Sequence, residues 1–341
     1  MNLTNHQFRL AARPVGLPKR SDWNYVEEPV RDPGPGEVLV KTLYLSLDPA
    51  MRGWMNEGRS YIAPVGIGDV MRAGGAGKVI ASANPGFGVG DYVTGVLGAQ
   101  EYALISAEGT RGLVKVDPKL VPLPVYVGAL GLTGLTAYFG LLEVGQAKAG
   151  DTVVVSGAAG ATGMVAGQIA KIKGCRAVGI AGGAEKCDYI VKELGFDAAI
   201  DYKNENVLES LRKHCPKGVN VYFDNVGGDI LEQVLARLAF GGRIVLCGAI
   251  SQYNQMGGVM AGPRNYMQLI VRAGRMEGFL VFQFAERYPE AIAQLSKWVA
   301  EGKVKNKLDL QRGLENAPKT IIRLFTGANF GKQLLTLANA A

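Results

Sequence analysis

Residues 152–163 read Thr152-Val153-Val154-Val155-Ser156-Gly157-Ala158-Ala159-Gly160-Ala161-Thr162-Gly163, an apolar strand followed by a glycine-rich loop. An amphipathic helix is expected directly after the loop, over residues 163–173. Glycines let the backbone approach a pyrophosphate, and the N–H groups at a helix N-terminus meet its charge. The stretch therefore predicts a dinucleotide-binding unit. Its first glycine spacing is one residue off the usual pattern, so a turn that binds nothing stays an alternative.

The end of the next predicted strand distinguishes between the two nicotinamide nucleotides. An NAD site needs Asp or Glu about 20 residues further on, to hold the ribose 2′-hydroxyl. Here the sequence reads Ala181-Gly182-Gly183-Ala184-Glu185-Lys186. Small residues leave room for a 2′-phosphate, and Lys186 can neutralise it. Glu185 falls in the first helical turn, where it complements the helix dipole. We therefore expect NADPH/NADP+ as the cofactor rather than NADH.

Strand-like and helix-like segments alternate from about residue 129. The predicted helices cover residues 135–144, 163–173, 185–194, 229–238 and 288–301. The predicted strands cover residues 152–156, 176–181, 198–201, 219–224, 243–248 and 276–281. Short apolar strands interleaved with helices predict a doubly wound parallel sheet of the Rossmann type.

The first part of the chain carries short β signals separated by Gly and Pro, for example at residues 36–45, 100–105 and 113–116. This pattern, without long helical stretches, predicts a small barrel-like β domain. A chain of 341 residues is too long for one typical core. The strand and helix signals after residue 302 have no sheet of their own. We therefore expect a β domain over 1–128, an inserted nucleotide-binding domain over 129–301, and a return to the β domain over 302–341.

Composition narrows the class of protein. The net charge is +7, but Lys and Arg are scattered, which indicates a solvated basic surface rather than a nucleic-acid site. Neither a signal pattern nor an 18-residue apolar run is present, so we expect a cytoplasmic protein without a membrane partner. Four cysteines without metal-binding or paired spacing predict reduced thiols.

Two histidines, His6 and His214, limit the possible chemistry. His6 has no cysteine near it in the sequence, and His214 is followed by Cys215 but by no further Cys or His at metal-ligand spacing, which argues against a catalytic zinc with Cys and His ligands, and no metal is expected. A Ser/His/Asp triad also lacks a suitable histidine. Tyr253 is then the best-placed polar group for carbonyl chemistry, with packing within its loop as the alternative.

Candidate ligand-binding residues follow two of the predicted strands at their carboxyl ends, where Rossmann sheets hold ligands. Asn225, in Asp224-Asn225-Val226-Gly227-Gly228, offers both a donor and an acceptor to a cofactor ribose or pyrophosphate. Cys247-Gly248-Ala249-Ile250-Ser251-Gln252-Tyr253 follows the next strand. Residues 254–264 predict a long loop that could act as a lid, with Met256 and Met260 suited to an adaptable apolar surface.

The chain resembles the zinc-independent medium-chain dehydrogenases/reductases, in particular the prostaglandin reductase and alkenal double-bond reductase group. The resemblance covers nearly the whole length. It is carried by Ser46-Leu47-Asp48-Pro49-Ala50-Met51-Arg52, Gly134-Leu135-Thr136-Ala137-Tyr138-Phe139-Gly140, the glycine loop, Tyr222-Phe223-Asp224-Asn225-Val226-Gly227-Gly228, Gly248-Ala249-Ile250-Ser251 and Asn329-Phe330-Gly331-Lys332.

The resemblance implies a catalytic domain like the GroES barrel, with the cofactor domain inserted before a C-terminal return. It implies that Tyr253 contacts the substrate carbonyl. It implies a cofactor site made of the phosphate-loop residues Gly160, Ala161, Thr162 and Gly163, the 2′-phosphate contacts Lys186 and Tyr202, and the further residues Asn225, Cys247, Gly248, Ala249, Ile250, Ser251, Tyr253, Phe279, Leu280, Val281 and Asn329.

The leading functional hypothesis is NADPH-dependent reduction of the C=C bond of an α,β-unsaturated aldehyde or ketone. Hydride would reach the β-carbon, and Tyr253 would stabilise the resulting enolate. NADPH-dependent quinone reduction is the alternative enzyme, and a non-catalytic NADPH-binding or RNA-associated protein is the third hypothesis. The resemblance also implies a homodimer. The partner we expect is a small enal or enone, with neither nucleic acid nor a membrane.

Overall fold

A computed structural model describes residues 2–58, 60–255 and 262–337. The chain divides into two compact units. The first comprises Met1–Val127, Leu308–Asn329 and Gln333–Ala341, and the second comprises Gly128–Lys307 and Phe330–Lys332. The last part of the chain therefore contributes to both units. Within the described residues, every helix is too short or too polar to span a bilayer.

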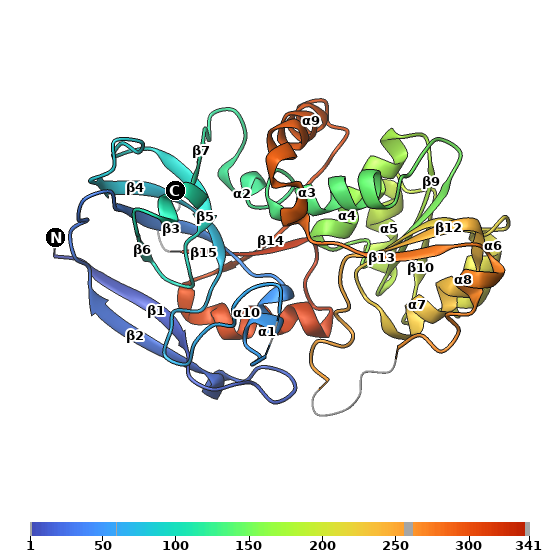
Figure 1. Cartoon of the computed structure of the whole chain (residues 1–341), viewed down its shortest axis with the longest axis horizontal. Coiled ribbons are helices and arrows are strands. Elements are labelled where there is room, and N and C mark those ends of the chain that lie inside the picture. The colour runs from blue at the N-terminus through green and yellow to red at the C-terminus, as the bar shows by residue number, and fades with distance from the viewer. Residues whose placement is uncertain (1, 59, 256–261, 338–341) are drawn as a thin grey trace. The chain divides into compact units, whose positions relative to one another are not determined.

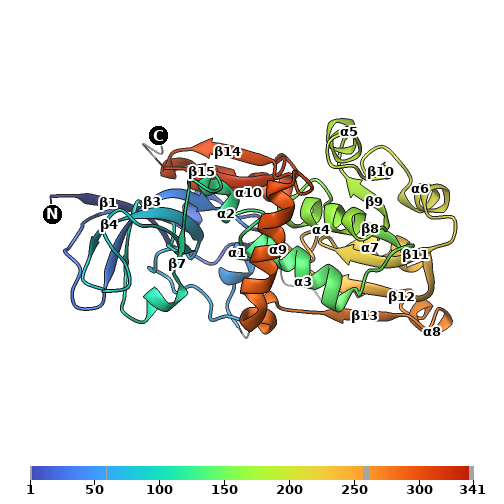
Figure 2. The same ribbon diagram turned by 90° about the horizontal axis from the view of Figure 1, so that it is seen from above.

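The second unit is built on a parallel sheet with the strand order β10-β9-β8-β11-β12-β13. Figure 2 shows the strands in this order. From β8 the chain moves outward through β9 to β10, and then returns to the other side of β8 with β11. This is the strand order of the doubly wound Rossmann fold, whose ligand crevice lies at the carboxyl ends of the two strands beside the reversal.

The elements of this unit match most of the expected boundaries, and helices lie on both sides of the sheet (Figure 1). The strands are β8 (Thr152–Ser156), β9 (Arg176–Ala181), β10 (Ala198–Asp201), β11 (Val219–Asp224), β12 (Leu238–Leu246) and β13 (Arg275–Gly278). The helices are α3 (Leu132–Phe139), α4 (Ala161–Ile172), α5 (Ala184–Lys192), α6 (Val207–His214), α7 (Gly228–Leu235), α8 (Gln268–Val271) and α9 (Tyr288–Ala300).

Three elements differ most from the expectation. The strand predicted over 276–281 is β13, which ends at Gly278, and a 3-10 helix begins at Val281. The helix predicted over 135–144 ends at Phe139 and continues as a π-helical turn over Gly140–Val144. The strand predicted over 243–248 begins earlier, at Leu238, and ends at Leu246. The helix predicted over 229–238 covered its first residue, whereas α7 ends at Leu235 and the strand runs with an irregular register against β11. It ends early because the next two backbone N–H groups, of Cys247 and Gly248, donate to the carbonyl of Asp224.

The first unit holds an antiparallel sheet with the order β14-β15-β3-β4-β5-β7, in which β6 pairs with β3, and a separate hairpin of β1 and β2. Its strands are β1 (Thr4–Leu10), β2 (Trp23–Pro29), β3 (Val38–Ser46), β4 (Gly74–Ser82), β5 (Tyr92–Val96), β6 (Tyr102–Ile105), β7 (Val114–Val116), β14 (Leu308–Arg312) and β15 (Lys332–Thr336). Its helices are α1 (Ala50–Trp54), α2 (Leu123–Tyr126) and α10 (Ala317–Thr326).

Apolar strands and one face of α4 form the core around the glycine loop. Val153, Val154 and Val155 of β8 are fully buried, as the unbroken apolar run of a covered parallel strand requires. Gly167 in α4 is also buried, and a Cβ placed on it would lie 1.8 Å from the Cζ of Phe196. The helix therefore approaches the Phe196 ring more closely than any side chain at this position would permit.

We predict that Gly167→Ala destabilises the protein by about 1–3 kcal/mol, because the added methyl overlaps a buried ring that has little room to move. In a helix interior, alanine is more favourable than glycine by about 1 kcal/mol. Without the steric overlap, the substitution would therefore stabilise the protein instead. Gly53→Ala in α1 is the matched control, since a Cβ there meets nothing within 4 Å. Urea unfolding midpoints measure both. Midpoints that shift in the same direction would contradict the packing argument.

Candidate functional site

The glycine loop joins β8 to α4 in a tight turn. Gly157 has a φ of +59°, a conformation that favours glycine, and its carbonyl accepts a hydrogen bond of 2.9 Å from the N–H of Gly160. A Cβ on Gly163 would lie 2.3 Å from the same carbonyl oxygen. Helix α4 begins at Ala161, so Ala161, Thr162 and Gly163 form its first turn, where N–H groups have no partner within the helix. This loop fits a pyrophosphate.

The chain returns to this loop near its end. The N–H of Gly331 donates to the carbonyl of Ala159 at 3.0 Å, and Gly331 forms a parallel bridge with Gly160. Beside it, the Phe330 ring meets the ring of Tyr189 edge to face, and the Lys307 ammonium lies 4.2 Å from the Phe330 centroid. The resemblance pointed to the Asn329–Lys332 motif, but sequence reasoning did not assign Gly331 to the phosphate loop.

Asn225 links the two strands on either side of the reversal. Its backbone N–H donates to Ser156 Oγ at 2.9 Å, and its side-chain Nδ2 donates to the Ser156 carbonyl at 2.7 Å. Because Ser156 is the last residue of β8, these bonds fix the start of the phosphate loop against the end of β11. The amide nitrogen of Asn225 is thus used within the protein, and this bond fixes the orientation of its carboxamide.

The neighbouring Asp224 is a buried hydrogen-bond acceptor at the same two strand ends. Its Oδ1 accepts hydrogen bonds from Ser156 Oγ at 3.0 Å, Tyr222 Oη at 2.8 Å, and the N–H groups of Val226 and Gly227 at 2.9 Å. The side chain is fully buried, and its Oδ2 has no hydrogen-bond partner among the residues that the structure describes. Burial raises the pKa of the Asp224 carboxyl above its usual value, although the donors oppose the shift.

A second cluster lies at the end of β9. The side chain of Tyr202 and the Lys203 stem both lie against Gly182: a Cβ there would be 2.9 Å from Tyr202 Cε1 and Oη, and 3.0 Å from Lys203 Cε. Lys186 lies in the first turn of α5, directly after this glycine turn. The predicted residues Lys186 and Tyr202 therefore flank one turn. Lys203 also belongs to this cluster but was not predicted, because nothing in the sequence indicates that residues 182 and 203 touch.

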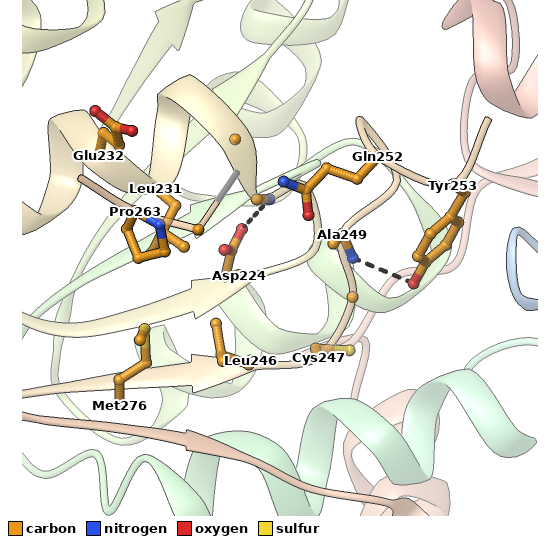
Figure 3. Close-up of a pocket in the computed structure, with 14 residues that line it drawn as sticks. Asp224, Leu231, Glu232, Leu246, Cys247, Ala249, Gln252, Tyr253, Pro263 and Met276 are labelled. Carbon is orange, nitrogen blue, oxygen red and sulfur yellow. Dashed lines mark hydrogen bonds between the residues drawn. The ribbon is translucent and has the colours of Figure 1, made fainter. Parts of the chain in front are cut away.

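The residues after β12 form the third part of the site. Tyr253 folds back so that its Oη accepts a hydrogen bond of 3.2 Å from the N–H of Ala249. The phenol oxygen also lies 2.9 Å from where a Cβ on Gly248 would be. Figure 3 shows this bond and the neighbouring Gln252 and Cys247. Burial raises the pKa of the Cys247 thiol to about 12, so the thiol stays protonated at neutral pH.

A cavity of about 430 Å³ lies next to this loop, within the second unit. Its walls come from the carboxyl ends of β11 and β12, the start of α7 and the loop after β12 (Figure 3). The lining is largely apolar, with a few polar groups such as Asp224 and Tyr253, which is typical of a ligand pocket. The lining side chains include Leu231, Leu246, Cys247, Pro263 and Met276.

The remaining predicted residues are dispersed. Ile250 and Ser251 follow in the turn after Ala249. Phe279 lies just beyond β13, and its ring packs where a Cβ on Gly140 would fall, 2.5 Å from Cζ. Its side chain therefore serves the core, and Leu280 and Val281 follow it. Asn329 lies in the first unit, after α10. Met256 and Met260 lie outside the described residues. Among the residues described, no group of three His, Cys, Asp or Glu gathers as a metal site.

Comparisons with known proteins place these observations in a family. Residues 6–113 match the model of the N-terminal domain of oxidoreductase, and residues 161–297 match the model of zinc-binding dehydrogenase. The chain is 42% identical to the NADP+-dependent 2-alkenal reductase of Nicotiana tabacum, over 98% of both chains. It is 41% identical to the NADPH-dependent curcumin reductase of Escherichia coli, over 98% of this chain and 97% of the relative.

A solved structure is also similar. The crystal structure of CurA from Vibrio vulnificus in complex with NADPH superposes with a TM-score of 0.92 at 42% identity, covering 98% of this chain and 99% of that one. The predicted fold class, a GroES-like β domain with a Rossmann domain, is confirmed.

We predict that Asp224→Asn is at least as stable as the parent at pH 8. The folded carboxyl has a raised pKa, so the parent carries a cost that is absent below the unfolded pKa of about 3.9 and grows as the pH rises through the folded pKa. The advantage of the asparagine should therefore shrink as the pH is lowered from 8 towards 4. Urea unfolding across this range measures it.

Asp224→Ala is the contrasting variant. It removes the acceptor, leaves buried donors unpaired, and should cost more than about 2 kcal/mol at every pH. An Asp224→Asn variant as unstable as Asp224→Ala, or an asparagine advantage that does not change with pH, would show that the ionised carboxylate is required.

Proposed function

The chain belongs to the zinc-independent medium-chain dehydrogenase/reductase family, and from this premise we propose that it reduces the C=C bond of α,β-unsaturated aldehydes and ketones. It is an NADP-dependent oxidoreductase, and its cofactor is NADPH. The observation that carries the proposal is Tyr253, whose hydroxyl is fixed by Ala249 at the carboxyl end of β12. The names of the two relatives support the substrate class.

The glycine loop fits the cofactor's pyrophosphate, since Gly163 sits so close to Gly157 that a Cβ would fill the turn. We propose that the first turn of α4 holds the pyrophosphate, that Lys186 and Tyr202 meet the 2′-phosphate, and that Asn225 and residues 247–253 line the nicotinamide half. Phe279 would contribute its backbone, because its ring packs on Gly140. Asn329 completes the proposed set.

Tyr253 is the proposed hydrogen-bond donor to the substrate. NADPH supplies a hydride for the β-carbon of the conjugated system, and negative charge then develops on the carbonyl oxygen. A phenol has one donor and two acceptor positions. Tyr253 Oη accepts from the Ala249 N–H, which holds the phenol oxygen in place, and we propose that its O–H donates to the substrate oxygen. A donor fixed in advance stabilises the enolate oxygen without reorganising during the reaction. A proton added to the α-carbon completes the reduction.

Tyr253→Phe should lower kcat for a small enal by about 10²–10³-fold, the usual loss when one such donor is removed. The dissociation constant for NADPH should change less than threefold, because the ring and backbone stay in place. Tyr25→Phe is the matched control, since its partly exposed hydroxyl lies on β2. Stopped-flow oxidation of NADPH with 2-alkenals and fluorescence titration give the two values. Full activity of Tyr253→Phe would contradict the assignment.

Quinone reduction is the alternative, and parallel assays separate it. A solved quinone oxidoreductase of Pseudomonas syringae shares 26% identity with the chain, at a TM-score of 0.75. A kcat/KM for quinones that exceeds the value for enals and enones, and that Tyr253→Phe leaves unchanged, would replace the proposed reaction with this one.

The thiols support a reducing compartment. All four cysteines are free, and burial raises the pKa of the Cys175 and Cys215 thiols to about 11. Protonated, buried thiols resist oxidation. We therefore extend the proposal to the cytoplasm.

We also propose that two copies associate through the edge of the parallel sheet. Strand β13 ends the strand order, and such an edge offers backbone groups for pairing with another strand. Large apolar side chains are exposed on α8 and next to β13, which is unusual for a surface that faces only water. They are Tyr266, Met267, Ile270, Val271, Leu280 and Phe282. A second copy of the chain presents the same edge and the same apolar side chains.

Ile270→Asp should convert the dimer to a monomer, because a carboxylate would be buried in the apolar contact. Light scattering coupled to gel filtration measures the mass, for which one chain contributes 36.2 kDa. Val89→Asp is the control, since Val89 is as exposed as Ile270 but lies in a turn of the first unit. A parent protein that runs as a monomer at micromolar concentration would refute the proposed edge contact.

A further inference from the structure

The turn after β9 has a second lysine beside it. The Lys203 Cε is 3.0 Å from where a Cβ on Gly182 would be, so its stem folds back over the glycine turn. The ammonium nitrogen is one bond of about 1.5 Å further on, which keeps it within about 4.5 Å of that point. Lys203 lies in the turn after β10 and is exposed, yet its side chain extends over Gly182.

Asp201 holds the backbone of Lys203 next to the glycine turn. Its Oδ1 accepts hydrogen bonds from the N–H of Gly183 at 2.7 Å and from the N–H of Lys203 at 3.1 Å. Its Oδ2 accepts from Asn204 Nδ2 at 2.7 Å. One buried carboxylate therefore ties the turn after β9 to the turn after β10. Gly183, with a φ of +96°, takes a conformation that a side chain would strain.

Against the opposing effect of burial, hydrogen bonds from Asn204, Gly183 and Lys203, and with them the charge of Lys203, lower the pKa of the nearby Asp201 carboxyl. Across residues 2–58, 60–255 and 262–337, Lys203 forms no ion pair. The nearby carboxylate of Asp201 is satisfied by the donors just named, and Glu205 accepts from the Asp201 N–H at 3.2 Å and from Ser210 Oγ at 2.6 Å. A cation held over the side-chain-free turn that precedes Lys186 and the first turn of α5 is arranged for an anion.

We propose that Lys203 is a specificity-determining residue that binds the 2′-phosphate of NADPH together with Lys186, and that Asp201 is the positioning residue that holds it there. Gly182 is also required for this binding site, because any side chain at this position would displace both Tyr202 and Lys203. A dianionic phosphate gains from two cations that approach from different turns, whereas the 2′-hydroxyl of NADH gains nothing. The inference rests on the cofactor and not on the proposed substrate.

Binding measurements on the purified full chain test this without turnover. Isothermal titration gives dissociation constants for NADPH, NADH, 2′-AMP and 5′-AMP with the parent, Lys203→Met, Lys203→Arg and Lys217→Met. Lys217 is an exposed lysine in the turn before β11 and serves as the matched control. Lys203→Met should weaken NADPH and 2′-AMP by about tenfold or more, and leave NADH and 5′-AMP within twofold. Lys203→Arg should stay within about threefold of the parent.

Two further readouts separate a direct contact from a structural effect. The salt dependence of NADPH binding should be shallower in Lys203→Met, because one cation fewer meets the phosphate. Gly182→Ala should reduce the preference for NADPH over NADH severalfold, since the methyl pushes Lys203 and Tyr202 aside while the backbone remains allowed. Equal losses for NADPH and NADH in Lys203→Met, or no loss beyond twofold for 2′-AMP, would overturn the proposal whatever substrate the enzyme reduces.

Discussion

The second unit depends on one buried hydrogen-bond acceptor, the side-chain oxygen Oδ1 of Asp224. Its Oδ1 gathers donors from β8, from β11 and from the turn that follows, while its backbone carbonyl receives the N–H groups that end β12. Such a concentration of donors offsets much of the cost of burying the carboxyl. Because Ser156 and Asn225 are held by the same network, the phosphate loop and the residues after β11 and β12 keep fixed positions relative to one another.

Local signals predicted most of the parallel sheet. Strands β8, β9, β10 and β11 were predicted to the residue because each is a short apolar run that ends at a glycine, a helix signal or a polar residue. The start of β12 was missed because its irregular pairing depends on β11, which lies 19 residues earlier at Val219. Periodicity along one strand carries no information about such a pairing.

The same distinction applies to the site. The glycine loop and Lys186 could be proposed as cofactor contacts because each belongs to a pattern of consecutive residues. The roles proposed for Lys203 and Asp201 could not be predicted, since they depend on the contact of two neighbouring strand ends. Phe279 was assigned from resemblance to the cofactor site, but a local motif does not state which way a ring points, and here it points towards Gly140. Asn329 was likewise assigned from the resemblance, and it lies after α10, distant in sequence from the glycine loop.

The bond between Gly331 and Ala159 has a consequence for how the protein is made. It joins two residues 172 positions apart, and the later one, Gly331, follows every strand of the parallel sheet in the sequence. Synthesis on the ribosome proceeds from the N-terminus, and domains fold as their residues emerge. The Rossmann sheet can assemble once β13 has emerged, but its phosphate loop receives this backbone partner only after Gly331 has been synthesised, 53 residues after the end of β13. A nascent chain that stalls late would thus carry a folded sheet with an unfinished nucleotide site.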